Sequence, residues 1–169
     1  MRPFVLKMAY TNGILTVALD ENEQEIGKIF QEQRIVPREN LYITSKLWNT
    51  HHQPNLVARA IRKSLKDLRL EYLDLYLMHW PVAFNYIDDD TLWPKDAQGA
   101  PLLDNTCEIE DTWKAMETLV DEGKTRAIGV SNFNITRLKR ILAIARHKPV
   151  VNQVLDIIFS SVSPTPKKG

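Results

Sequence analysis

The chain has 169 residues, of which 44% are hydrophobic and 25% are charged, and its formal net charge is +1. A chain of this length can bury one substantial core, and this composition is typical of a water-soluble globular protein. The small net charge argues against nucleic acid or an anionic membrane as a partner. Cys107 is the only cysteine, which excludes an intrachain disulfide and favours a reducing compartment.

The sequence contains no targeting or membrane signal that we can identify. No apolar run reaches the ~20 residues that a membrane span needs. The first ten residues include basic residues but no apolar segment followed by a small-residue cleavage site. We therefore expect a mature, cytoplasmic chain.

The first part of the chain combines short apolar runs with helical spacing. Residues 14–19 favour a strand. Asp20 stands three residues before Glu23, the spacing of a capping box, and predicts a helix start. Residues 41–44 predict a short buried strand that ends before Lys46. The apolar positions of the expected helix are Ile26, Ile29 and Phe30.

A long amphipathic helix is expected next, followed by a second strand. Pro54 suits the first turn of the helix. Residues 73–78 are almost continuously apolar, broken only by Asp74, as expected for a strand that helices cover. Residues 81–108 have no periodicity, and a loop of this length is usually functional. The apolar stripe of the helix consists of Val57, Ile61, Leu65 and Leu68.

Two further helix–strand units follow this loop. Helical spacing over residues 109–120 ends near Gly123, a natural stop, and residues 127–130 predict a strand. Asn134 is placed to cap the next helix, and residues 150–153 predict the last strand. The apolar positions of the two helices are Ile109, Trp113, Met116 and Val120, then Ile135, Leu138, Leu142 and Ala145.

Strands that alternate with helices predict an α/β protein with a parallel sheet and right-handed crossovers. A doubly wound sheet and a TIM barrel both fit this order, and periodicity does not choose between them. The six glycines are scattered and form neither GxGxxG nor GxxxxGK, which disfavours a classical nucleotide-binding sheet.

Polar or ionisable side chains come at the end of each main expected strand. In parallel α/β proteins these ends lie at one edge of the sheet, where ligands bind. The candidates are Lys46 with Trp48, His79 with Trp80, Ser131 with Asn132, and Asn152 with Gln153.

Each candidate also has a plainer interpretation. Lys46 fits an ordinary solvated lysine, and His79 fits a hydrogen-bonded core histidine. Ser131 and Asn132 fit the start of a turn, and Gln153 alone is uninformative. From these residues alone, both interpretations stay open.

No metal site is expected. His51 and His52 are adjacent, so on a helix their side chains point about 100° apart, and no carboxylate or cysteine stands at ligand spacing. The three acids at residues 88–90 lack the glycine and glutamate of an EF-hand and predict a solvated loop.

Five segments are together similar to the aldo-keto reductase family, and they cover roughly residues 20–154. Three carry the most specific motifs: ITSKLWNTHHQP (43–54), LEYLDLYLMHWPVAF (70–84) and DTWKAMETLVDEGKTRAIGVSNFN (111–134). NEQEIGKIF (22–30) and KPVVNQV (148–154) extend the resemblance.

This resemblance implies a (β/α)8 TIM barrel, here incomplete with about four to five of eight parallel strands, and NADPH-dependent reduction of aldehydes and ketones. The family uses an aspartate, a tyrosine proton donor, a lysine and a histidine. By motif, the catalytic residues are Lys46 and His79, the residues that hydrogen-bond the nicotinamide carboxamide are Ser131, Asn132 and Gln153, and the substrate-pocket walls are Trp48, Trp80 and Trp93.

The chain departs from the family pattern before its first expected helix. The family motif DxAxxYxNE, aligned on Asn22 and Glu23, puts Leu15 in the place of the aspartate and Asp20 in the place of the tyrosine. A solvated carboxylate is ionised at neutral pH and has no proton to give. Tyr10 lies ten residues too early. The family's glycine-rich opening, first strand, last two strands and C-terminal phosphate-binding cluster are also missing.

We therefore expect residues 1–154 to form a partial aldo-keto reductase barrel and residues 155–169 to form a divergent, disordered tail. The expected function is NADP(H)-dependent reduction of small aldehydes or ketones, with impaired activity and weakened NADP(H) binding in this chain. The alternative is a non-catalytic fragment or pseudoenzyme, the product of a shortened gene, that associates with a partner or with itself through open barrel edges. A phosphate-binding barrel or flavodoxin-like protein is disfavoured, because the chain has no glycine-rich loop.

Overall fold

A computed structural model describes residues 7–11, 14–18, 23–33 and 37–154. Its strands form one sheet in the order β1 to β6. β1 (Lys7–Thr11) pairs antiparallel with β2 (Ile14–Ala18). From β2 to β6, each pair of neighbouring strands is parallel. The parallel strands after β2 are β3 (Leu41–Leu47), β4 (Leu73–Met78), β5 (Thr125–Ser131) and β6 (Asn152–Gln153).

The order of the parallel strands decides between the two topologies that the sequence left open. Each parallel strand lies beside its predecessor in the chain, with no reversal of order. A doubly wound sheet needs such a reversal, whereas a barrel adds each strand on the same side. The five parallel strands therefore form part of a barrel, as predicted.

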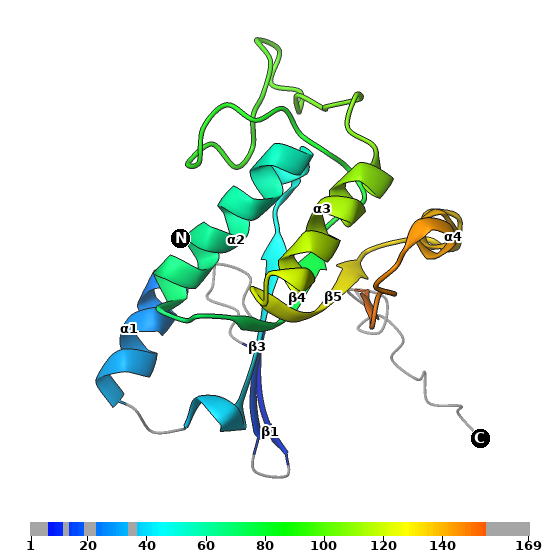
Figure 1. Cartoon of the computed structure of the whole chain (residues 1–169). Coiled ribbons are helices and arrows are strands. Elements are labelled where there is room, and N and C mark those ends of the chain that lie inside the picture. The colour runs from blue at the N-terminus through cyan, green and yellow to red at the C-terminus, as the bar shows by residue number, and fades with distance from the viewer. Residues whose placement is uncertain (1–6, 12–13, 19–22, 34–36, 155–169) are drawn as a thin grey trace, which may run out of the picture.

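The helices cover the outer side of this curved sheet (Figure 1). They are α1 (Glu23–Gln33), α2 (Pro54–Leu68), α3 (Ile109–Asp121) and α4 (Ile135–Ile144), with short 3₁₀ turns η1 (Arg38–Asn40) and η2 (Asn49–His51). Asn134 caps α4 as predicted, because its side chain accepts a hydrogen bond from the Arg137 amide at 2.9 Å. No helix in the described ranges is long and apolar enough to span a bilayer.

The main core lies between the sheet and these helices. The predicted stripe of α2 is buried throughout and meets the outward face of β3 and β4. Each large side chain buried in this way contributes about 1.5–3 kcal/mol relative to exposure. The buried cluster includes Ile43, Leu47, Val57, Ile61, Leu65, Leu68, Tyr76, Met78, Trp113, Met116 and Leu119.

Gly27 lets α1 lie directly on the end of α2. A Cβ atom at this position would stand 2.2 Å from the backbone oxygen of Asp67 and 2.9 Å from the carbonyl carbon of Leu68. Such distances are far below van der Waals contact, so only glycine permits this helix pair to approach so closely.

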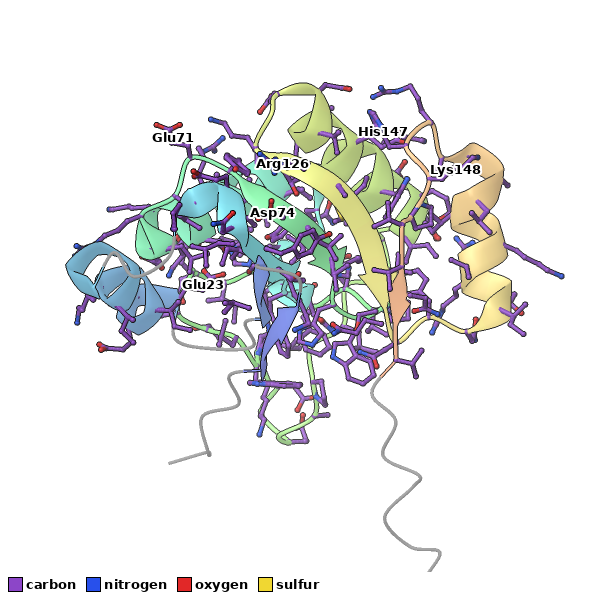
Figure 2. All side chains as sticks on the ribbon, turned by 90° about the horizontal axis from the view of Figure 1, so that it is seen from below. Glu23, Glu71, Asp74, Arg126, His147 and Lys148 are labelled. Carbon is purple, nitrogen blue, oxygen red and sulfur yellow. The ribbon has the colours of Figure 1, made fainter. Side chains whose placement is uncertain are left out.

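Asp74, the single acid in the apolar run of β4, is a structural residue at the opposite end of the sheet from the candidate site. Its side chain is 2% exposed, and it accepts a hydrogen bond from the Ile43 amide at 2.9 Å. Arg38 at 2.8 Å and Arg126 at 3.2 Å neutralise its charge. Both guanidinium groups also contact the ring of Tyr72 (Asp74 and Arg126 are labelled in Figure 2).

Several details differ from the sequence predictions, including the start of β5 at Thr125 instead of residue 127. β1 was not predicted, because its pairing with β2 is a contact between segments and leaves no signal in either one alone. β3 continues to Leu47, so Lys46 lies inside the strand instead of after it. β6 begins at Asn152 instead of Val150. The expected cap at Asp20 and the expected tail at residues 155–169 lie outside the described residues.

Candidate active site

Lys46 and His79 lie on neighbouring strands at the same edge of the sheet. Lys46 is paired with Leu77, and the His79 amide donates to the Leu47 carbonyl at 3.1 Å. This hydrogen bond continues the ladder one residue beyond β4 and fixes the backbone of His79 beside the end of β3. Both residues line one cleft of about 740 Å³.

Tryptophan rings form the wall of this cleft. The ring of Trp48 lies edge-on to His79 at 5.1 Å and edge-on to Trp93 at 5.0 Å. Trp80 stacks beside His79 at 6.1 Å, and Phe84 supports Trp93 at 5.6 Å. Trp80 and Trp93 remain 42% and 51% exposed, so their faces are open to a ligand. All three predicted wall residues therefore lie in the same cleft as Lys46 and His79.

The long loop over residues 81–108 supplies one side of the cleft. Isolated bridges join Phe84 to Leu103 and Lys95 to Pro101, so the loop folds back on itself. The Trp48 indole donates from Nε1 to the Leu92 carbonyl at 2.7 Å and ties the loop to the end of β3.

Ser131, Asn132 and Gln153 lie together at the ends of β5 and β6, beside the cleft. Ser131 donates to the Gln153 carbonyl at 2.7 Å, and the Asn132 side chain donates to the His79 carbonyl at 3.0 Å. Asn132 has a left-handed backbone with φ 60°. Among the described residues, no hydrogen bond uses the Asn132 side-chain oxygen or the Gln153 side-chain amide, so an acceptor and an amide remain for a ligand.

Asn152 joins this group, although its role was not assigned from the sequence. Its side chain donates to the Phe133 carbonyl at 2.8 Å and accepts from the Phe133 amide at 3.3 Å. It thus holds the turn after Asn132 against β6. The sequence carried only a weak signal for this role, since an asparagine in a short strand is not distinctive.

A buried carboxyl lies behind Lys46, on the helix side of β3. Glu23, at the start of α1, accepts a short hydrogen bond from Ser45, and Ser64 also contacts it. Burial raises the pKa of Glu23 and raises the pKa of the nearby Tyr76 hydroxyl well above its ordinary value. Neither residue was predicted to belong to the cleft, yet both line it.

Both histidines after β3 are buried. His52 is 1% exposed, and its buried ring has a pKa lowered to about 3, chiefly by burial and also by His51 and His79. The described ranges contain no group of three residues suited to hold a metal ion. Asp88 accepts the Asp90 and Thr91 amides and closes a turn, as befits a loop acid.

Comparisons with known proteins agree with this geometry. Residues 17–165 match the aldo/keto reductase family. The chain is 48% identical over 155 residues to aldo-keto reductase family 1 member A1 of Gallus gallus, covering 89% of this chain and 46% of the relative. It is 49% identical over 137 residues to an uncharacterized oxidoreductase of Schizosaccharomyces pombe, covering 81% and 41%.

Solved structures give the same result for the fold. The aldose reductase of Schistosoma japonicum superposes with a TM-score of 0.74 at 48% identity, over 79% of this chain and 44% of that one. The aldose reductase of Giardia lamblia gives 0.72 at 46% identity, over 79% and 45%. The predicted incomplete barrel is confirmed. The chain spans less than half the length of the relatives that it matches.

Proposed function

We propose that this chain, which belongs to the aldo-keto reductase family, carries the carbonyl-binding half of an NADP(H)-dependent reductase site and turns substrate over slowly. One observation carries the proposal. Lys46 and His79, from adjacent strand ends, open together on a cleft whose other walls are tryptophan rings.

His79 is the residue that contacts the substrate carbonyl in this proposal. An imidazole N–H can donate to a carbonyl oxygen and orient it, and this interaction strengthens as negative charge develops there. The positive charge of Lys46 adds to the same stabilisation. The faces of Trp80 and Trp93 favour a planar, apolar substrate, so aromatic aldehydes and ketones are the class that the cleft suits best.

The group at the ends of β5 and β6 suits the carboxamide of a nicotinamide ring. Such a carboxamide offers one acceptor and two donors, and it would meet the Gln153 amide, the Asn132 side-chain oxygen and the Ser131 hydroxyl. NADP(H), when bound, supplies the hydride. The chain's own residues orient the nicotinamide ring. The hydrogen bond from Asn132 to the His79 backbone carbonyl holds the nicotinamide site and the carbonyl site at a fixed position relative to each other.

The slow turnover follows from the sequence before α1. Asp20 takes the place of the family's proton-donating tyrosine, and Leu15 takes the place of the aspartate partner of the lysine. General acid catalysis contributes about 10²–10⁴-fold, so its loss leaves binding with little turnover.

Two measurements on the purified chain test this function. Aromatic aldehyde should quench the tryptophan fluorescence saturably, and NADPH oxidation with that aldehyde should run at least about 100-fold below a tyrosine-containing relative. His79→Leu should weaken aldehyde binding, whereas Lys114→Met, an exposed lysine on α3, should not. Absence of saturable quenching would refute the carbonyl site, and turnover at the rate of the relative would refute the impairment.

Association with a second copy is a separate candidate function. Apolar side chains on α4 and beside β6 are exposed, among them Ile135 at 74% and Val150 at 61%, and contiguous apolar exposure marks interaction surfaces. The other exposed apolar side chains in these two segments are Leu142, Ile144, Val151 and Val154. Sizing chromatography with light scattering should show a concentration-dependent dimer that Ile135→Lys disperses. A monomer at every concentration would contradict this candidate.

A cytoplasmic location remains part of the proposal. Cys107 is a free cysteine, half-buried beside Thr112, and burial raises the pKa of its thiol. Such a thiol is unreactive and suits a reducing compartment. Fractionation of cells expressing the chain should recover it with cytoplasmic markers, and recovery in a secreted fraction would contradict this location.

A further inference from the structure

We infer that Asp89 is a positioning residue: it latches the loop after β4 onto α2 and thereby fixes the tryptophan wall of the cleft. Arg59 on α2 donates two hydrogen bonds to the Asp89 carboxylate, from Nε at 2.9 Å and from Nη2 at 2.6 Å. The Tyr86 hydroxyl donates to the same carboxylate at 2.9 Å, and His51 Nε2 lies 3.3 Å from it. Donors from three separate segments thus converge on one side chain.

In the hydrogen bond between His51 and Asp89, the histidine is the donor and the carboxylate is the acceptor. Burial lowers the pKa of His51, so its ring is neutral at physiological pH. Its Nδ1 lies 3.0 Å from the Thr50 hydroxyl, which can donate to it. The other nitrogen, Nε2, then carries the hydrogen and donates to Asp89. The neutral ring therefore satisfies both neighbours at once.

The latch consists of one bidentate ion pair and two further hydrogen bonds. A carboxylate that accepts a bidentate guanidinium and two further donors is held in its ionised form. These contacts hold the pKa of Asp89 well below its usual range, with the Arg59 and Tyr86 hydrogen bonds as the main causes. The ring of Tyr86 also lies edge-on to His51 at 5.2 Å, so the loop packs on η2 as well as bonding to it.

A short covalent path leads from the latch to the wall. Asp89 precedes Leu92 by three residues and Trp93 by four. The Leu92 carbonyl accepts the Trp48 indole at 2.7 Å, and the Trp93 ring lies on Trp48. The segment 89–93 is therefore anchored at both ends, by α2 on one side and by Trp48 on the other. Trp93 is fixed even though half of its surface is exposed.

Because the tryptophan wall is already ordered, a ligand that binds to it does not have to offset the conformational entropy lost when a mobile loop becomes ordered. Release of the latch would let segment 89–93 move, with two consequences: Trp93 would become more accessible, and an aromatic ligand would bind more weakly. The first consequence concerns the chain alone. The second rests on the proposed carbonyl site.

The first test needs no ligand. Acrylamide should quench tryptophan fluorescence more efficiently in Asp89→Asn than in the unmodified chain. Arg59→Gln should do the same, and its side chain is 54% exposed, so this variant is not expected to unfold the chain. Asp89→Glu should restore the original quenching in part. Asp111→Asn removes the same charge from an exposed ion pair on α3 and is the matched control. Equal quenching in all five proteins would overturn the latch.

The second test adds an aromatic aldehyde as the probe. Its dissociation constant should rise at least about tenfold in Asp89→Asn and Arg59→Gln, with thermal midpoints and the Asp111→Asn control unchanged. Unchanged affinity despite increased acrylamide quenching would overturn the positioning role. No aldehyde binding in the unmodified chain would refute the proposed function, while the acrylamide result would still decide the latch.

Discussion

The side-chain amide of Asn132 donates to the backbone carbonyl of His79 at 3.0 Å and joins the end of β5 to the end of β4. The backbone of Asn132 is left-handed, with φ 60°. The position of His79 thus depends on a residue 53 positions later in the chain. The candidate carbonyl site and the candidate nicotinamide site are one connected structure.

Substitution of Asn132 should separate the two parts of its role. Asn132→Gly keeps the left-handed backbone and loses the bond, at a cost of about 0.5–1.5 kcal/mol. Asn132→Ala loses the bond and strains the backbone, so it should cost about 1 kcal/mol more. Urea denaturation followed by circular dichroism measures both. Equal losses for the two variants would show that the backbone conformation is not a constraint.

Gly27→Ala should destabilise the chain although alanine is the better helix former. The new Cβ would stand 2.2 Å from the Asp67 carbonyl oxygen, so α1 would have to move away from α2. Forced overpacking costs about 1–3 kcal/mol, which outweighs the helix-propensity gain of about 1 kcal/mol. Lys28→Ala, next to it on α1, is the control and should shift the unfolding free energy by less than about 0.5 kcal/mol. A stabilised Gly27→Ala variant would mean that α1 does not pack as described.

Removal of the Asp74 carboxylate should cost about 1–3 kcal/mol, because Asp74→Ala leaves the buried Ile43 amide without its acceptor and removes the ion-pair partner of Arg38 and Arg126. Arg126→Gln should cost less than about 1 kcal/mol, since that side chain is 61% exposed. The comparison is made by thermal or urea unfolding of both variants. Similar losses would show that the Arg126 pair alone accounts for the contribution of the Asp74 carboxylate.

Because of the buried His52, the free energy of unfolding of the chain should decrease as the pH falls into the acid range. Its pKa is about 3 in the folded chain, against 6.5 for a solvated histidine, so the unfolded chain takes up a proton that the folded chain refuses. Stability is intact above about pH 6.5 and decreases by up to about 1.4 kcal/mol per pH unit as the pH falls toward 3. His52→Gln should flatten this part of the curve relative to the unmodified chain. Parallel curves for His52→Gln and the unmodified chain would exclude His52 as the source.

Periodic elements could be predicted from the sequence because their signal is local. The stripe from Val57 to Leu68 repeats at the helical period, and the cap at Asn134 depends only on a residue three positions away. The order of the strands after β1 could be anticipated for the same reason, although β3 runs past the end of its apolar run to Leu47. Convergence of Lys46, His79, Trp48 and Trp80 then followed from parallel topology, whereas Trp93 was expected beside them only from the family resemblance.

Features that depend on distant contacts could not be predicted in this way. β1 pairs with β2 through a hairpin that neither segment encodes alone. Asp89 appeared as one of three equivalent loop acids, and only the folded chain shows that Arg59, 30 positions earlier, singles it out. The burial of His52 was hidden as well, because adjacent histidines in sequence do not reveal which face packs on α3.

The central claim is that His79 contacts a carbonyl ligand in the tryptophan-walled cleft. The chain has four histidines, so carbon-13 labelling of their rings gives up to four imidazole signals by NMR, and the one missing from His79→Asn belongs to His79. Titration with an aromatic aldehyde should move that signal saturably and leave the His147 signal in place. An unmoved His79 signal at saturating aldehyde would contradict the account.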